Sequence, residues 1–280
     1  MSVAHEEREI AISVPKDKSE VVSSFLPTDF DLPTGREEEW RFTPLRRMKQ
    51  LLVPLPDADG AAVVVDAEPF VVGIDNADGP VQPGEWLVPV DVASALAWSG
   101  ASNTTFITVP PNTELERPAT ITISGTGDSY QRIRITVEHD SSATVVINHE
   151  GTGRHGENIE VELGSRARLK LVVIQDWERD AVHVGRIHTH IGRDATLTQV
   201  VATFGGDLVR LRLVDQVGLG LVLDHRFVDH HLADVLQRRQ VVHGIEQHLL
   251  DDRAQTARTS LAFQCLASDG CQSVRAELEV

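Results

Sequence analysis

The run ATVVI at residues 143–147 recurs in similar form three times, as ATITI at 119–123, ARLKLVVI at 167–174 and ATLTQVVA at 195–202. Each run begins with an alanine and continues with β-branched or aliphatic residues, which favour strands. The alanines are separated by 24, 24 and 28 residues, and each follows a turn-like segment such as Gly164-Ser165. The chain therefore repeats one strand-and-turn unit at a nearly constant period.

A period in the twenties, with strands and no helical pattern between them, is typical of coils that stack on one another. One coil cannot bury its apolar face alone, so neighbouring coils must supply a shared core. We therefore predict an all-β core in residues 106–213, folded as a parallel β-helix of stacked coils with short flanking helices.

Strand alternation in the centre of the chain indicates which side chains face the core. Ile133, Ile135 and Val137 alternate with charged or hydroxyl residues, whereas residues 171–174 form one continuous apolar run. Alternation is typical of a strand with one buried face, and a continuous run is typical of a strand buried on both faces. The residues that we expect mostly inside are Ile133, Ile135, Val137, Ile159, Val161, Leu169, Leu171, Val173, Leu197 and Val200.

The two flanking regions differ from the repeat. Residues 1–105 are expected to form an irregular N-terminal arm and a small α/β region, with short helices at about residues 44–52 and 91–99. Residues 214–280 form an atypical C-terminal tail in this interpretation, because they fit neither the coil pattern nor a full amphipathic helix. We expect that tail to be the least stable part of the molecule.

The overall charge and composition exclude several classes of protein. The formal net charge is −16 and the isoelectric point is near 5.1, so no basic surface for nucleic acid dominates. The N-terminal residues show no basic segment followed by an apolar one, and no apolar run reaches the roughly 18 residues that a membrane span needs. We therefore expect a cytoplasmic protein that binds neither nucleic acid nor a membrane.

Gly151, Gly153 and Gly156 have the spacing of a dinucleotide-binding fingerprint, and Asp176 lies 20 residues after the last of them. That fingerprint must open a helix, whose N-terminus holds the pyrophosphate. Here the third glycine is followed by ENIEVELG, which alternates as a strand does. We interpret the glycines as a turn and assign no cofactor-binding residue.

His183, His188 and His190 form the densest group of histidines in the core. His188 and His190 would project from one face of a strand, which is a workable geometry for binding a metal. The alternative is that all three line the polar outer face of a coil, and no carboxylate or cysteine accompanies them at ligand spacing. The sequence therefore leaves the identity of any metal ligands open.

Two further groups carry weaker signals. Cys265 and Cys271 lie six residues apart, do not match a CxxC site, and could supply at most half of the thiolates of a cluster. His230 and His231, beside Asp229, fit a solvated helix face as well as they fit a binding site.

The sequence contains no nucleophile elbow, metalloprotease helix or phosphate-binding loop. We assign no catalytic residue and expect the protein not to be an enzyme.

Several of these segments, taken together and in order, resemble the SufB/SufD family of cytoplasmic iron–sulfur cluster assembly proteins. The likeness extends over roughly residues 35–213, and the short N-terminal arm is more similar to the SufD branch than to the SufB branch. The segments that carry the resemblance are Trp40–Leu45, Asn158–Gly164, Ala167–Leu171, Gln175–Trp177, Gly192–Leu197 and Ala202–Gly206.

The resemblance implies a right-handed parallel β-helix that pairs with a SufB-like paralogue and binds a SufC-like ATPase. In such a complex this chain would be a non-catalytic scaffold subunit, and a homodimer is an alternative assembly. The complex would hold the iron–sulfur cluster transiently, with no cofactor bound stably by this chain alone. The family's interface histidine has no match in the 74 residues after Gly206, so no functional residue is carried over.

Two other functions compete with this one. A polysaccharide-active β-helix enzyme would need clustered carboxylates or basic residues along a groove, and normally a secretion signal. The charges that we expect to be exposed on the core, Arg132 and Arg134 on one strand and Glu160 and Glu162 on another, alternate in sign and form no such cluster. A purely structural β-helix with no ligand is the third reading. Co-purification with an ATPase would separate the first function from the other two.

Overall fold

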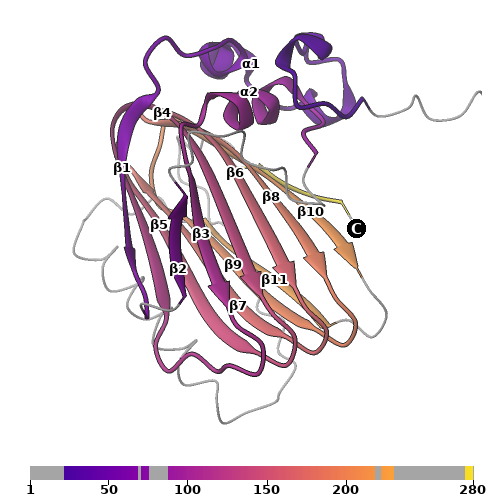
Figure 1. The fold of residues 1–280 in the computed structure, drawn as a ribbon. Helices are drawn as coiled ribbons and strands as arrows, with labels where there is room; N and C mark the ends of the chain where they lie inside the picture. The colour runs from indigo at the N-terminus through magenta and orange to yellow at the C-terminus, as the bar shows by residue number, and fades with distance from the viewer. Residues whose placement is uncertain (1–21, 69–70, 76–87, 218–221, 230–274, 280) are drawn as a thin grey trace, which may run out of the picture.

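The computed structural model describes residues 22–68, 71–75, 88–217, 222–229 and 275–279 (Figure 1). The helices are α1 (Leu45–Met48) and α2 (Val92–Gly100), with short 3₁₀ turns at Pro27–Asp29, Glu38–Trp40 and Lys49–Leu52. The strands are β1 (Asp59–Asp66), β2 (Val72–Asp75), β3 (Thr104–Val109), β4 (Ala119–Val137), β5 (Ser142–Thr152), β6 (Arg154–Leu163), β7 (Arg168–Trp177), β8 (Val182–Ile191), β9 (Thr196–Thr203), β10 (Leu208–Val217), β11 (Val222–Asp229) and β12 (Arg275–Glu279).

The strands stack as a β-solenoid of about four turns, which confirms the predicted fold class. Strands β5, β7, β9 and β11 pair in parallel on one wall, and β6, β8 and β10 pair in parallel on the other. The long strand β4 belongs to both walls, because its first half pairs with β5 and its second half with β6. One coil is thus a strand of the first wall followed by a strand of the second. The right-handed turn of the coil stays a prediction.

The pairing register corrects the coil length that the alanines suggested. Ile121 pairs with Ile147, and Ile147 with Val173, a separation of 26 residues each time rather than 24. Val173 then pairs with Val201, a separation of 28. The first two alanine intervals fall short by two residues, and a shift of two keeps every side chain on the same face of a strand. The shorter spacing therefore leaves the predicted faces of these coils unchanged.

The space between the two walls is filled by aliphatic side chains over most of its length. All ten residues predicted to lie inside are buried. Nine of them belong to one continuous apolar cluster between the walls. The exception is Val200, which packs with Val146 and Val172 in a separate cluster on the outer face of the first wall. Two-sided burial of β7 explains why residues 171–174 lack alternation.

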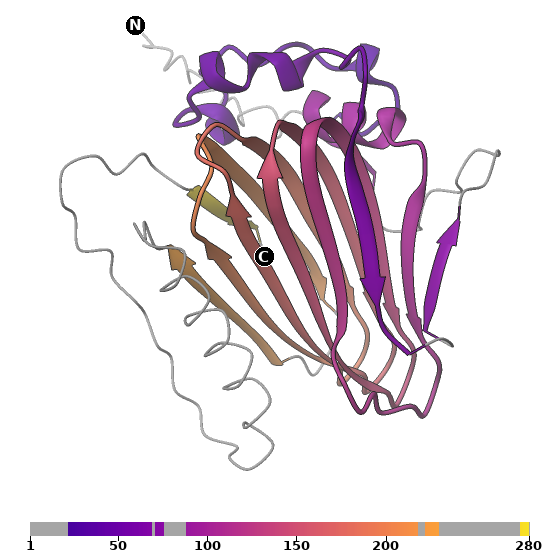
Figure 2. The same ribbon diagram turned by 90° about the vertical axis from the view of Figure 1, so that its left-hand side faces the viewer.

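The helices gather at one end of the solenoid, where β6 and β8 begin (Figures 1 and 2). Asp91 caps α2 by accepting a hydrogen bond of 2.7 Å from the Ser94 backbone N–H, as expected of an N-cap aspartate. Tyr130 and Val184, on the outer face of the second wall, pack in one cluster with apolar residues of α2. Both predicted helices are present, although the first is a single α-turn followed by a 3₁₀ turn.

The flanking strands extend the sheet at its ends. Strand β1 pairs with β4 in the antiparallel sense, and β3 stacks in parallel on the second half of β4. Beyond residue 213, β11 pairs with β9, and β12 with β10, both in parallel. Cys265, Cys271, His230 and His231 lie outside the described residues. No helix in the described part of the chain is long and apolar enough to span a membrane.

Candidate metal centre inside the solenoid

The interior of the solenoid changes from apolar to polar near the helices. Inward positions at the end of β5 and β7 and at the start of β6 and β8 carry polar side chains instead of aliphatic ones. These side chains are nonetheless buried, with no more than 2 % of the residue surface exposed. The buried polar residues of this group are His149, His155, Glu157, Gln175 and His183.

A tight corner between β5 and β6 brings these residues together. Gly151 and Gly153 adopt φ values of +91° and +118°, a region that residues with a Cβ rarely enter. A Cβ at Gly151 would also lie 2.0 Å from the carbonyl oxygen of Gly125 in the coil below. The glycines therefore make the corner, as the sequence predicted, and Gly156 lies in strand β6 rather than at the start of a helix.

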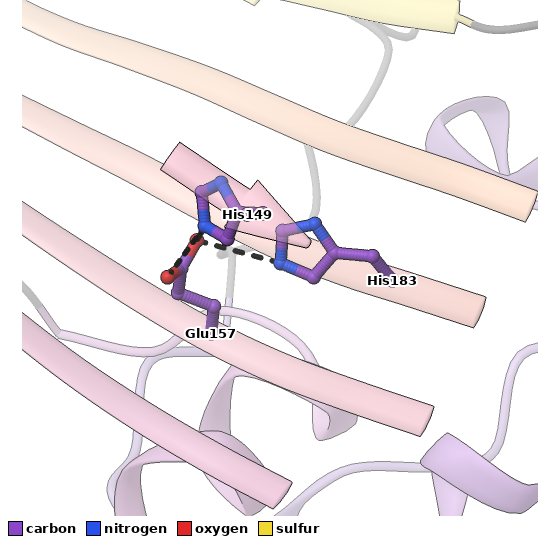
Figure 3. Close-up of side chains that lie close together, drawn as sticks. All are labelled: His149, Glu157 and His183. Carbon is purple, nitrogen blue, oxygen red and sulfur yellow. Dashed lines mark hydrogen bonds and ion pairs between the residues drawn. The ribbon is translucent and has the colours of Figure 1, made fainter. Parts of the chain in front are cut away.

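The corner places one carboxylate beside two neighbouring imidazole rings (Figure 3). The Nε2 atom of His149 lies 3.0 and 3.1 Å from the two carboxylate oxygens of Glu157. The Nε2 atom of His183 lies 3.4 Å from Oε2 of the same carboxylate. One ligand atom from each of the three residues can be chosen so that all three lie within 4.8 Å of one another.

The opposite nitrogen of each ring is fixed by an acceptor. The Nδ1 atom of His149 lies 2.9 Å from the Ile174 carbonyl oxygen, which can only accept a hydrogen bond. The Nδ1 atom of His183 lies 2.7 Å from Oε1 of Gln175. That oxygen also accepts from the indole N–H of Trp177, a group that only donates, at 2.6 Å. Both Nδ1 atoms therefore carry a proton and donate it.

His155 lies in the same interior but has a complete set of partners. Its Nε2 atom donates to the Thr152 carbonyl oxygen at 3.1 Å, and its Nδ1 atom accepts from the Ser129 hydroxyl at 2.8 Å. Its ring stacks on Trp177, with ring centroids 4.2 Å apart. Burial lowers the pKa of His155 to about 4. This residue is a neutral histidine with every polar atom satisfied.

The charge state of the three clustered residues follows from burial and from their neighbours. Burial alone would raise the pKa of Glu157, but the nearby rings of His149 and His183 hold that pKa below its ordinary value. Burial lowers the pKa of His183, against the opposing attraction of Glu157. Glu157 is therefore ionised and His183 neutral near pH 7, inside a space with little water to solvate either.

The structure separates the three histidines that the sequence grouped. His183 lies inside the solenoid, whereas His188 and His190 follow the opposite parity along β8 and lie on its outer face. The three histidines therefore do not form one group of candidate metal ligands, because His183 faces away from His188 and His190. The two residues that form the cluster with His183 are His149 of β5 and Glu157 of β6, and the sequence interpretation missed both. Continuing the alternation back from Ile159 by two residues gives Glu157, a signal that was available.

The outer face of the second wall uses its buried charges to hold the N-terminal segments. Arg132 is 9 % exposed and Glu160 is 4 % exposed, which corrects the expectation that both are solvated. Arg132 donates to the Ala101 carbonyl oxygen at 3.0 Å. Arg186 lies two coils beyond Arg132 on the same face and donates to the Val88 carbonyl oxygen at 3.0 Å. Arg134 and Glu162 pair across neighbouring strands at 3.2 Å. These charges have structural partners.

Comparison with known proteins finds a family similarity that covers the coils. Residues 121–218 match the family model described as the SUF system iron–sulfur cluster assembly SufBD core domain. A protein of Mycobacterium tuberculosis, named as an iron–sulfur cluster assembly SufBD family protein, is 37% identical over 202 residues, which cover 71% of this chain and 51% of the relative. A protein of Mycobacterium leprae with the same family name is 33% identical over 201 residues, covering 70% and 51%.

These matches cover only part of this chain and only part of each relative. The chain spans about half the length of the curated relatives it matches. No solved structure matches it. The similarity is to the SufBD family as a whole and does not distinguish its SufB and SufD branches.

Proposed function

The chain carries a SufBD core domain, and from this premise we propose that it takes part in the assembly of iron–sulfur clusters. In this proposal it is a cytoplasmic, non-catalytic scaffold subunit. It pairs with a SufB-like paralogue and works with a SufC-like ATPase, which supplies the energy for conformational change. The cluster is the cargo of the assembled complex rather than a resident cofactor of this chain.

The observation that carries the proposal is where the family match lies. Residues 121–218 comprise the coils from β4 to β10, which form the continuous core of the molecule. The match therefore rests on the folded solenoid and not on a flanking segment. The relatives named as iron–sulfur cluster assembly proteins are similar over twice that length, which supports the same assignment.

The geometry of the solenoid supports pairing with a paralogue. Strands β11 and β12 stand at the two ends of the strand order. A strand at the end of a sheet presents backbone N–H and C=O groups that a strand of a second chain can pair with. A paralogue built from the same coils has the matching spacing between strands, so edge pairing would continue both walls across the interface.

Co-purification is the direct test. A tagged copy of the chain is expressed with the SufB-like and SufC-like proteins of the same genome, and the eluted complex is analysed by light scattering. We expect a complex that contains all three proteins, and an untagged copy should compete with the tagged one. A tagged β-solenoid of unrelated family and similar net charge is the control. Recovery of the chain alone, as monomer or homodimer, would contradict the proposed partners.

Anaerobic reconstitution tests the scaffold role separately. The purified chain is incubated with iron and sulfide, and absorbance and bound iron are measured after gel filtration. Cluster irons take about four protein ligands, typically thiolates, and the chain has two cysteines, Cys265 and Cys271. We expect no cluster to survive gel filtration. A stoichiometric cluster that is lost in a Cys265→Ser/Cys271→Ser double variant would instead identify an autonomous cluster carrier.

A further inference from the structure

We propose that His149, Glu157 and His183 bind one divalent transition-metal cation inside the solenoid. The ligands would be the Nε2 atoms of the two rings and the carboxylate beside them (Figure 3). This inference concerns a site in the chain itself and does not depend on the role in cluster assembly.

The first argument is the direction of the lone pairs. Because both Nδ1 atoms donate to fixed acceptors, only the Nε2 atom of each ring is left to offer a lone pair to a cation. Both lone pairs point toward the carboxylate of Glu157, which presents only lone pairs of its own when ionised. Within the described residues, His183 Nε2 makes no hydrogen bond, and Glu157 Oε2 lies 3.4 Å from it. A cation is what such a convergence of acceptors requires.

The second argument is the support behind the ligands. A metal-binding histidine almost always donates its other ring N–H to a carbonyl or carboxylate, which fixes the ring and makes the coordinating nitrogen more basic. The Ile174 carbonyl does this for His149, and the Gln175 side chain does it for His183. Trp177 in turn holds Gln175 in place. His155 has no such arrangement, since both of its nitrogens are already used.

The third argument is the separation of the ligand atoms. Imidazole nitrogen and carboxylate oxygen bind Zn²⁺ at about 2.0–2.2 Å, so in a tetrahedral site two ligand atoms lie roughly 3.3 Å apart. The Oε2 atom of Glu157 lies 3.1 Å from His149 Nε2 and 3.4 Å from His183 Nε2. The two ring-to-carboxylate distances therefore match those around an ion, and all three ligand atoms lie within 4.8 Å of one another.

The donor set decides the class of cation. Two imidazoles and one carboxylate suit Fe²⁺, Co²⁺ and Zn²⁺, whereas Mg²⁺ and Ca²⁺ prefer oxygen ligands alone. A divalent ion would also balance the buried negative charge of Glu157, which otherwise requires a protonated histidine. Because the three residues are nearly inaccessible to solvent, the ion has to enter as the chain folds.

The test therefore supplies the metal during folding. The full-length chain, with Cys265→Ser and Cys271→Ser to remove thiolate ligands and without a polyhistidine tag, is expressed in cobalt-supplemented medium. Bound metal is counted by mass spectrometry, and the visible d–d bands of Co²⁺ report its ligands. We expect one Co²⁺ per chain, and X-ray absorption that shows two imidazole ligands.

Matched variants assign the ligands. Glu157→Gln and His183→Gln keep the shape of the site and should weaken retention of Co²⁺ at least about tenfold, while Gln175→Leu, behind His183, should weaken it by about 10–100-fold. His155→Gln is the control, because it removes a neighbouring buried histidine and should leave the metal in place. Circular dichroism establishes that each variant is folded.

Two results would overturn the proposal. One is a folded Cys-free parent that contains no Co²⁺ or Zn²⁺, which would assign the three residues to a buried His149–Glu157 ion pair. The other is stoichiometric metal without imidazole ligands in the X-ray absorption spectrum, which would place the ion elsewhere and needs no variant to fold.

Discussion

The two ends of the solenoid interior are built from the same parallel ladders but from opposite kinds of side chain. At the end far from the helices, Val137, Leu163 and Ile191 stack in successive coils of the second wall. At the end near the helices, His155 and His183 stack in the same wall. Aliphatic layers need only shape and volume to match, whereas buried polar layers need a partner for each atom. The polar end therefore restricts the choice of each side chain more strictly than the aliphatic end does.

Trp177 belongs to the main apolar cluster and also contacts the polar residues, so its removal should have the largest effect. The side chain is fully buried, stacks on His155 and donates to Gln175. Trp177→Ala should lower the free energy of unfolding by about 3–5 kcal/mol, because it leaves a cavity and frees a buried amide. Urea unfolding measures this loss. A loss below about 1 kcal/mol would mean that the two ends are not coupled through this residue.

Leu171→Ala probes the aliphatic interior alone. Leu171 is completely buried in the main apolar cluster, so its truncation should cost about 2–5 kcal/mol. Val64→Ala, at a side chain that is 62% exposed, is the control and should cost less than about 0.5 kcal/mol. Equal losses for the two variants would show that stability does not follow the stacked core.

His188 contrasts a buried histidine of the outer wall with those inside. Burial, Arg186 and His190 together lower its pKa to about 4. Between about pH 6.5 and pH 4 the unfolded chain binds a proton at this residue and the folded chain does not, so stability falls as the pH is lowered. We expect a contribution on the order of 1–3 kcal/mol, which His188→Gln removes. Urea unfolding of the unchanged protein and of His188→Gln is compared at about pH 7 and pH 5. The same pH dependence in both proteins would show that His188 does not make this contribution.

The helical cover over the polar end should make the smallest contribution. Asp91 caps α2, so Asp91→Ala should cost about 1 kcal/mol. Asp91→Asn keeps the cap while removing the charge that lies 3.9 Å from Arg212, and should cost less. Thermal unfolding resolves both. An equal loss for the two variants would show that the ion pair, rather than the cap, fixes the helix.

The fold could be predicted from the sequence because two-residue alternation survives errors in register. The repeated runs predicted the stacked coils. Ile133 and Leu171 were correctly predicted to lie inside, although the first two alanine intervals are two residues shorter than the pairing register. The resemblance to the SufB/SufD family is likewise confirmed by the core domain over residues 121–218. Periodicity and family likeness are both properties of many residues together, which makes them robust.

The polar cluster could not be predicted in the same way. His149, Glu157 and His183 lie on three different strands, and their proximity depends on the corner at Gly151 and on the pairing of distant coils. Of the three clustered residues, only His183 was among the histidines that the sequence pattern singled out. Sequence spacing predicts ligands that share one strand or helix, whereas this group is assembled across the interior of the solenoid.

The uniform register also has a consequence for the order of folding. Each new coil pairs residues 26 or 28 positions apart, so every addition closes a loop of nearly the same length at nearly the same entropic cost. Strand β4 belongs to both walls and is the template on which the next coil is laid. Growth from β4 toward β10 follows the direction of synthesis, and amide hydrogen exchange should be slowest in β4 to β6 and faster in each later coil.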